Sequence, residues 1–320
     1  MKRFCKKMIL FAVLFCTILL LLDVLSVREP FRKWFALLTD SYDYYYSLDT
    51  VHEVKDVYLR MVREEGDYTK LVVGDSVCHQ MLNDLHEVNT DYCIAGNNRA
   101  LSMAGEYLLV REFLELHEGV TDVYLIVGLD FLQTEIDETF GFGYVVAPFV
   151  QEGMLDNLDE ETIAEIKKKF GRAVTQKQVV DWIEYSPINR KLYLSYLRDR
   201  AMMRPYTGEV RLSDIAADYL VKTKELCEEY GAKLYLLPDP LADSESRHAQ
   251  AEMLWEDFSA RGLDELFPDY FEEINYYPEE QFEDDIHFGE PYNTREVLNQ
   301  RLQELYLDRG YLDGLILSEQ

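Results

Sequence analysis

Short apolar segments alternate with helical patterns along most of the chain, and this order restricts the fold strongly. Four segments have the length and composition of buried strands: "KLVVG" at 70–74, "DYCIAG" at 91–96, "DVYLIVG" at 122–128 and "AKLYLLPDP" at 232–240. Strands that are separated by helices form a parallel sheet with helices on both faces. The sequence therefore predicts an α/β fold over residues 69–320, a three-layer sandwich around a mostly parallel sheet.

The chain between the third and fourth predicted strands, about residues 133–211, contains no obvious strand of this sheet. Its composition is that of charged helices, and Gly141 and Gly143 could act as hinges near its start. We interpret it as a helical insertion over the carboxyl ends of the strands, where α/β sheets bind ligands. A helical layer that contacts no site is an alternative of equal weight.

The first 28 residues differ in composition from the rest of the chain. Four basic residues within the first seven precede an apolar run at 8–22, which is interrupted by Asp23. No small-x-small cleavage signature follows, so the pattern favours an uncleaved signal anchor; a removed signal peptide is the alternative. We expect a single-pass protein of the cell membrane with an extracytoplasmic domain, joined to the anchor by a tyrosine-rich connector and a leading helix at 29–68.

The charge of the chain is strongly negative and unevenly distributed. The formal net charge is −28, although residues 1–33 carry +5, so that the remainder carries −33. A domain with this charge repels DNA, RNA and anionic lipid headgroups. The sequence therefore predicts no nucleic-acid partner.

Three of the five cysteines, Cys78, Cys93 and Cys227, lie outside the predicted anchor at 1–28. Three thiols cannot form a closed disulfide framework, and their spacing fits no zinc pattern. Buried free thiols are therefore expected, with a Cys78–Cys93 bridge as the alternative. Because no His/Asp/Glu cluster has metal-ligand spacing either, we expect neither a metal nor another cofactor.

The first predicted strand ends at Gly74, and Asp75 and Ser76 stand directly before a helical pattern. Both residue types accept hydrogen bonds from the first turn of a helix, so a capping role is the simpler interpretation of either. A serine at the carboxyl end of a parallel strand also lies where such sheets open to solvent, beside the N–H groups of the next helix. There Ser76 could act as a nucleophile whose attack creates an oxyanion.

A nucleophilic serine needs a base, and the base needs an acid that orients it. Asp284 and His287 form such a pair near the C-terminus, three residues apart and directly before the last helical pattern. A short turn with this spacing can bring the carboxylate back to the imidazole and fix its tautomer. A lone histidine is more often structural, and two other histidines follow an acidic residue at the same spacing, so His287 is distinguished by its place before the last helix.

With "GDS" at 74–76 and "D-x-x-H" at 284–287, the chain resembles the SGNH (GDSL-like) hydrolase superfamily. The resemblance covers about residues 70–143 and 212–305, and the insertion is not covered. It implies a flavodoxin-like α/β fold. The anchor and the "DDIHF" ending look most like the membrane-anchored branch, which includes proteins of D-alanyl-lipoteichoic acid transfer and of exopolysaccharide O-acetylation.

The resemblance implies a role for each matching residue. Ser76 is the expected nucleophile, His287 the base and Asp284 its orienting acid. Gly96 matches the second-block glycine of the family, whose N–H would join that of Ser76 in the oxyanion hole.

The third block departs from the family pattern, because Asp130 stands where the oxyanion asparagine is expected. An ionised carboxylate cannot donate a hydrogen bond, and losing one donor typically costs about 100-fold or more in rate. Either Asn97 or Asn98 supplies the missing donor, or two backbone groups form the hole. The simpler alternative is that Asp130 caps a turn after the third strand.

These features predict a serine esterase or O-acyltransferase that acts on an acylated envelope glycan or polyol polymer through an acyl-serine intermediate. By analogy with the resembling branch, a membrane-bound O-acyltransferase is the expected protein partner. The alternative is a catalytically weak binding or assembly protein of an envelope acylation system, which the departure at Asp130 would suit.

Overall fold

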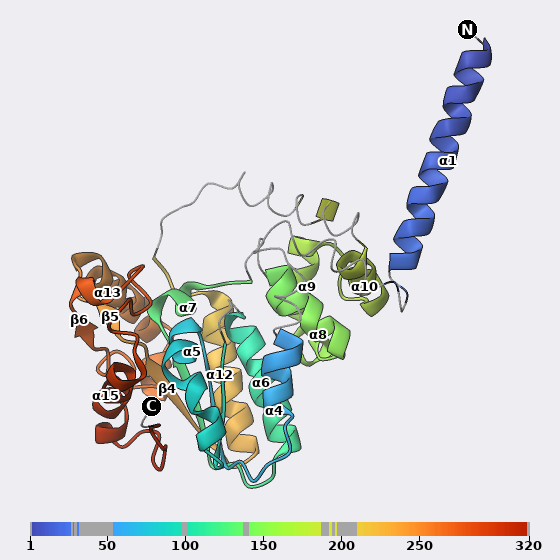
Figure 1. Cartoon of the computed structure of the whole chain (residues 1–320). Coiled ribbons are helices and arrows are strands. Elements are labelled where there is room, and N and C mark those ends of the chain that lie inside the picture. Colours follow the sequence, from blue (N-terminus) through green and yellow to red (C-terminus); the bar gives the residue numbers. More distant parts are fainter. Residues whose placement is uncertain are drawn as a thin grey trace. The chain divides into compact units, whose positions relative to one another are not determined.

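The computed structural model describes residues 2–26, 54–97, 101–136, 141–186 and 210–318, with a few single residues between these ranges. The chain divides into two compact units, whose elements are labelled in Figure 1. The first unit contains residues 1–52 and 138–205, and the second contains residues 53–137 and 206–320. The tyrosine-rich part of the predicted connector lies outside the described residues.

The second unit is built around a parallel sheet of four strands. The strands are β1 (Lys70–Gly74), β2 (Tyr92–Gly96), β3 (Asp122–Val127) and β4 (Lys233–Pro238), in the spatial order β2-β1-β3-β4. All neighbouring strands in this sheet are parallel, and Gly74 at the end of β1 lies opposite both Gly96 and Ile126. The four predicted strands and the α/β class are therefore confirmed, and the carboxyl ends of the strands meet at one edge of the sheet.

Helices connect these strands in the order that the sequence predicted. The main ones are α5 (Ser76–Leu82), α6 (Ser102–Leu116), α12 (Asp214–Glu229) and α15 (Arg295–Leu305). α6 packs against β1 and α12, and α12 also packs against β4. α5 and α15 bury apolar side chains in one cluster with sheet residues such as Val72 and Ile126. Because β1, β2 and β3 are buried almost continuously, both faces of the sheet are covered there.

Shorter elements belong to the second unit as well. They are a π-helix (Val54–Leu59) that continues into α4 (Arg60–Val62), a 3₁₀-helix (Asn83–Val88), α7 (Leu129–Gln133), β5 (Leu241–Ala242), α13 (Glu245–Ala260), α14 (Leu263–Leu266), β6 (Tyr276–Tyr277) and 3₁₀-helices at Glu279–Gln281 and Leu307–Arg309. β5 and β6 form a separate parallel pair. Cys78, Cys93 and Cys227 are buried free thiols, the outcome that the sequence favoured.

The first unit contains the N-terminal helix and most of the segment that was predicted as an insertion. The helices in the described part of this unit include α1 (Lys2–Ser26), a π-helix (Phe142–Val146), α8 (Ala147–Glu152), a 3₁₀-helix (Leu155–Asn157), α9 (Glu160–Phe170) and α10 (Lys177–Tyr185). Between residues 141 and 186, where this segment is described, it contains no strand. Its predicted position over the ends of the sheet strands stays a prediction.

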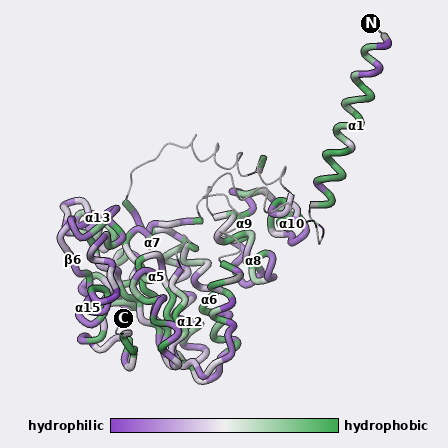
Figure 2. Tube along the Cα trace, viewed as in Figure 1, coloured by the Kyte–Doolittle hydropathy of each residue, from purple (hydrophilic) through white to green (hydrophobic). Residues whose placement is uncertain are grey.

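α1 is long and apolar enough to cross a membrane, by its length and composition. The candidate span is Arg3–Leu25, and only 6% of its most apolar window is buried inside the protein. Figure 2 shows hydrophobic residues along most of α1 and hydrophilic residues at its N-terminal end. The signal anchor and the cleaved signal peptide are both consistent with this helix.

Candidate active site

Asp75 and Ser76 occupy the junction between β1 and α5 and have different partners there. Asp75 is the N-cap of α5, because its Oδ1 accepts hydrogen bonds from the backbone N–H groups of Val77 at 3.0 Å and Cys78 at 3.5 Å. Ser76 is the first residue of the helix. The capping interpretation therefore applies to Asp75, and the hydroxyl of Ser76 is directed to another partner.

That partner is His287, which is 211 residues further along the chain. The ring Nε2 of His287 lies 2.7 Å from Ser76 Oγ, within hydrogen-bonding distance. The other ring nitrogen, Nδ1, lies 2.8 Å from Asp284 Oδ2 and 3.0 Å from Oδ1. The structure thus brings the three residues singled out in the sequence into one chain of hydrogen bonds, in the order serine, histidine, aspartate.

The carboxylate of Asp284 is stabilised in its ionised form. Partial burial alone would raise its pKa, but the backbone N–H of His287 at 2.8 Å and the His287 ring lower it, with help from the N–H of Ile286 at 3.2 Å. The net effect is a pKa below the usual value for aspartate. An ionised Asp284 can hold the proton on Nδ1 of His287 and leave Nε2 free to accept the proton of Ser76.

Gln80, one helical turn after Ser76 on α5, fixes the loop that carries His287. Its Nε2 donates to the carbonyl oxygen of Phe288 at 2.9 Å, and its Oε1 accepts from the Phe288 N–H at 3.0 Å. The Phe288 side chain is fully buried in the cluster shared by α5 and α15. Gln80 was not predicted from the sequence, where its only signal is the spacing of four residues from Ser76, which places both on one face of a helix.

Gly96, an expected oxyanion-hole residue, ends β2 in close contact with α5. A Cβ atom at this position would lie 2.8 Å from both Cys78 Sγ and the backbone nitrogen of His79, so only glycine fits without a shift. The Gly96 carbonyl oxygen accepts hydrogen bonds from His79 Nδ1 at 3.1 Å and from Asn83 Nδ2 at 2.7 Å. These contacts hold β2 against the helix that carries Ser76.

Asn97, also an expected donor to the oxyanion, is buried and engaged elsewhere. Its backbone N–H donates to the carbonyl oxygen of Gly74 at 2.9 Å, and its Nδ2 donates to the same oxygen at 2.5 Å and to Glu106 Oε1. An amide nitrogen has two hydrogens, so both have acceptors inside the protein. The predicted role of Asn97 as an oxyanion donor is not supported, because its amide connects β1 to α6. Asn98 lies outside the described residues.

Asp130 forms an ion pair. Its Oδ2 accepts a hydrogen bond from Arg247 Nη1 at 2.7 Å, and its Oδ1 accepts one from Gln250 Nε2 at 2.8 Å. It caps no turn by its side chain at the start of α7, where Gly128 is the N-cap. Arg247 Nη2 also donates to the carbonyl oxygen of Asp285 at 3.2 Å. Asp130 is thereby linked through Arg247 to the loop between Asp284 and His287.

Asp75 and Asp239 form a close pair of carboxyl groups at the ends of β1 and β4. The second oxygen of Asp75, Oδ2, accepts a hydrogen bond from the Gly128 N–H at 2.9 Å. Asp239 is 3% exposed, and its Oδ1 has no hydrogen-bond partner among the described residues. Burial and the nearby charge of Asp75 raise the pKa of Asp239 well above its usual value, because both favour the protonated form. Asp239 was not predicted as a site residue from the sequence, although its place at the end of the fourth strand was a signal.

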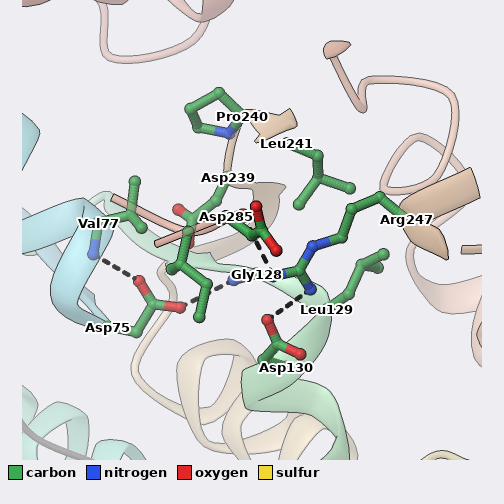
Figure 3. Close-up of a pocket in the computed structure, with 11 residues that line it drawn as sticks. Asp75, Val77, Gly128, Leu129, Asp130, Asp239, Pro240, Leu241, Arg247 and Asp285 are labelled. Atoms are coloured by element: carbon green, nitrogen blue, oxygen red, sulfur yellow. Dashed lines mark hydrogen bonds and ion pairs between the residues drawn. The ribbon is translucent and has the colours of Figure 1, made fainter. Parts of the chain in front are cut away.

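A small cavity of about 20 Å³ lies at the ends of these strands, with room for roughly one water molecule. It is lined by residues that flank Ser76 and His287 in the sequence and by residues that follow β3 and β4 (Figure 3): Asp75, Val77, Gly128, Leu129, Asp130, Asp239, Pro240, Leu241, Arg247, Asp285 and Ile286. Figure 3 shows the Arg247 guanidinium between Asp130 and Asp285. Throughout the ranges that the structure describes, no group of three or more His, Cys, Asp or Glu side chains could hold a metal ion.

No protein-family model, curated protein or solved structure matches this chain. The chemistry of the site is therefore inferred from its own residues and their geometry.

Proposed function

We propose that this protein is a membrane-anchored, extracytoplasmic serine esterase or O-acyltransferase of the SGNH type, acting on a cell-envelope glycopolymer. The observation that carries the proposal is the hydrogen-bonded chain from Ser76 Oγ through the His287 ring to the Asp284 carboxylate. A serine alone is a weak nucleophile, and a neighbouring base that is itself oriented by an acid activates it. The three groups lie in this order at the carboxyl edge of a parallel sheet, where α/β folds bind ligands.

The proposed reaction has two halves that use the same groups. As Ser76 Oγ attacks the carbonyl carbon of an acyl ester, His287 Nε2 takes the hydroxyl proton and then delivers it to the departing alkoxide. This leaves the acyl group on Ser76. A sugar or polyol hydroxyl, or water, next gives its proton to His287 and attacks the acyl-serine, which transfers the acyl group and restores the serine hydroxyl. Asp284 stabilises the imidazolium in both halves.

The rest of the proposal follows from the fold and from the resemblance. A parallel sheet with the serine after β1 and the Asp-His loop before α15 supports a three-layer, flavodoxin-like SGNH sandwich. In the resembling family the backbone N–H groups of the nucleophile and of the second-block glycine, here Ser76 and Gly96, bind the oxyanion. The apolar helix α1 favours a substrate at the envelope, and a membrane-bound O-acyltransferase is the partner by analogy.

A second candidate function is binding or assembly without efficient catalysis. It is favoured by one observation, that the side chains of Asp130 and Asn97 are both engaged in other interactions. Asp130 is paired with Arg247, and both hydrogens of the Asn97 amide have acceptors inside the protein. A hole made of backbone N–H groups alone would lower the rate by about 100-fold or more relative to a hole with the side-chain donor.

A fluorophosphonate probe separates the two functions, because it forms a covalent adduct only with an activated serine. We expect the full chain in detergent micelles to be labelled, Ser76→Ala to abolish the labelling, and His287→Ala to reduce it strongly. Ser246→Ala is the matched control, since Ser246 is an exposed serine in the same unit. Labelling that persists in Ser76→Ala would reject Ser76 as the nucleophile. No labelling of the unmodified chain would reject the enzyme in favour of the binding protein.

A further inference from the structure

Asp23 is the only acidic residue in the candidate span, and it has partners from a distant part of the chain. Its side chain is buried, with the residue 6% exposed. Trp182 Nε1 donates a hydrogen bond to Asp23 Oδ2 at 2.9 Å, and Ser186 Oγ donates to Oδ1. Trp182 belongs to α10 and Ser186 directly follows it, so these bonds tie α10 to the last turns of α1 (Figure 1).

The length of the apolar run explains why Asp23 needs such partners. Residues 8–22 contain 15 apolar or uncharged residues, which extend about 22 Å as a helix. The hydrocarbon core of a bilayer is about 30 Å thick, so this shorter run places Asp23 inside the core, near its edge, when it is inserted. A carboxylate at this depth is costly unless it is paired, and the two donors from α10 and its end provide the pairing.

The same bonds fix the position of α10 relative to the end of α1. Trp182 is 47% exposed although its N–H is bonded to Asp23, so that its ring is open to the surroundings while its polar group is satisfied. Val179, three residues earlier and therefore on the same face of α10, is half-buried. A tryptophan with an exposed ring beside the end of a span is typical of the membrane–water interface.

We infer that α10 lies on the membrane surface from which α1 emerges, with the Trp182 ring among the lipid headgroups, and that the bilayer is the partner that covers this ring. The inference rests on the proposed membrane anchor and is independent of the chemistry at Ser76. Bonded together at the membrane–water interface, the end of α1 and α10 would restrict how the first unit can tilt relative to the membrane.

The chain contains its own reference for a test. Of its three tryptophans, Trp182 and Trp255 are almost equally exposed, at 47% and 49%. Trp255 lies on α13, in the second unit. In a Trp34→Phe background, Trp255→Phe leaves Trp182 as the only tryptophan, and Trp182→Phe leaves Trp255 as the only tryptophan.

Both full-length proteins are reconstituted into phosphatidylcholine vesicles whose acyl chains carry bromine at a shallow or a deep position, and vesicle flotation is checked. We expect brominated lipid to quench Trp182 at least twofold more than Trp255, with shallow bromines more effective than deep ones. Asp23→Leu, which cannot accept the hydrogen bonds, should bring the quenching of Trp182 down toward that of Trp255, and Asp23→Asn should preserve most of it. Equal quenching of the two tryptophans, or protein that does not float with the vesicles, would overturn the inference. Fluorophosphonate labelling of the same samples reports on Ser76 separately.

Discussion

Gln80 on α5 holds the backbone of Phe288 with both ends of its amide, at 2.9 Å and 3.0 Å. Because Phe288 follows His287 directly, the helix that presents the nucleophile also fixes the loop that presents its base. The distance between Ser76 and His287 therefore depends on a side chain that takes no part in the proposed chemistry. A base that is misplaced by about 1 Å can cost on the order of 100-fold in rate.

We predict that Gln80→Ala lowers kcat/KM for a small activated ester by about 10- to 100-fold without abolishing it. Gln80→Glu keeps the acceptor and loses the donor to the Phe288 carbonyl, so its loss should be as large or larger, because two oxygens then face each other. Steady-state kinetics over a pH series measures both variants. Gln303→Ala on the exposed face of α15 is the control and should behave like the unmodified chain. Unchanged kinetics in Gln80→Ala would show that the loop is positioned by other contacts.

Asp284→Asn tests the orienting acid. The amide has no charge to stabilise the imidazolium and can hold the wrong tautomer of His287, so we expect kcat to fall by about 10²- to 10⁴-fold. Since hydrogen bonds hold the pKa of Asp284 below its usual value, Asp284 stays ionised above about pH 4, and its contribution is lost only as the pH falls through that lowered pKa. Stopped assays in the full chain, from about pH 4 to 8, check both points.

Asp285→Asn is the matched control for this prediction. Asp285 is adjacent to Asp284, but its backbone adopts a left-handed conformation with φ of 64°, and its carbonyl oxygen accepts a hydrogen bond from Arg247. Asparagine tolerates this conformation as well as aspartate does. We therefore expect Asp285→Asn to change kcat by no more than about threefold. Equal losses of kcat in the two variants would mean that the conformation of the loop, and not the charge of the Asp284 carboxylate, determines kcat.

The sequence predicted the elements whose signals are local. The four strands were visible as short apolar runs, and Ser76, Asp284 and His287 were found because each stands beside the end or the start of a strong pattern. The partners of Asp130 could not be predicted in this way, because Arg247 is 117 residues away and reaches it only through the packing of α13. The partners of Asn97 could not be predicted for the same reason, since its acceptors on Gly74 and Glu106 belong to other elements.

The ion pair between Asp130 and Arg247 changes what substitution of Asp130 should do. If Asp130 stood in for the oxyanion donor, Asp130→Asn would raise the esterase activity. In the structure both carboxylate oxygens already accept hydrogen bonds, from Arg247 and Gln250, so the new amide would turn a donor toward a donor. We therefore predict a loss of about three- to tenfold in kcat/KM, transmitted through the bond from Arg247 to the Asp285 carbonyl.

A double-mutant cycle with Arg247→Met measures this link. The effect of Asp130→Asn on kcat/KM should be smaller when Arg247 is absent, because the pair is already broken. Asp214→Asn is the control, since Asp214 forms a comparable surface ion pair with Arg261 at 2.8 Å, and it should leave the activity unchanged. An increase in activity in Asp130→Asn would instead favour the oxyanion account.

The free energy of unfolding of Asp239→Asn, relative to that of the unmodified chain, should increase as the pH rises. Asp239 is buried beside Asp75, and its pKa is raised well above the value of about 4 that it has in an unfolded chain. From about pH 4 up to that raised pKa, the folded protein keeps a proton that the unfolded chain loses, so stability falls with pH, by at most about 1.4 kcal/mol per unit from this group. Asparagine is neutral and keeps a donor for Asp75, so the variant lacks this slope.

Urea unfolding of the full chain in micelles, from about pH 5 to 8, should show an advantage of Asp239→Asn that grows with pH, whereas Asp218→Asn on the exposed face of α12 should show none. A constant or shrinking difference would mean that Asp239 is ionised beside Asp75 in the folded protein.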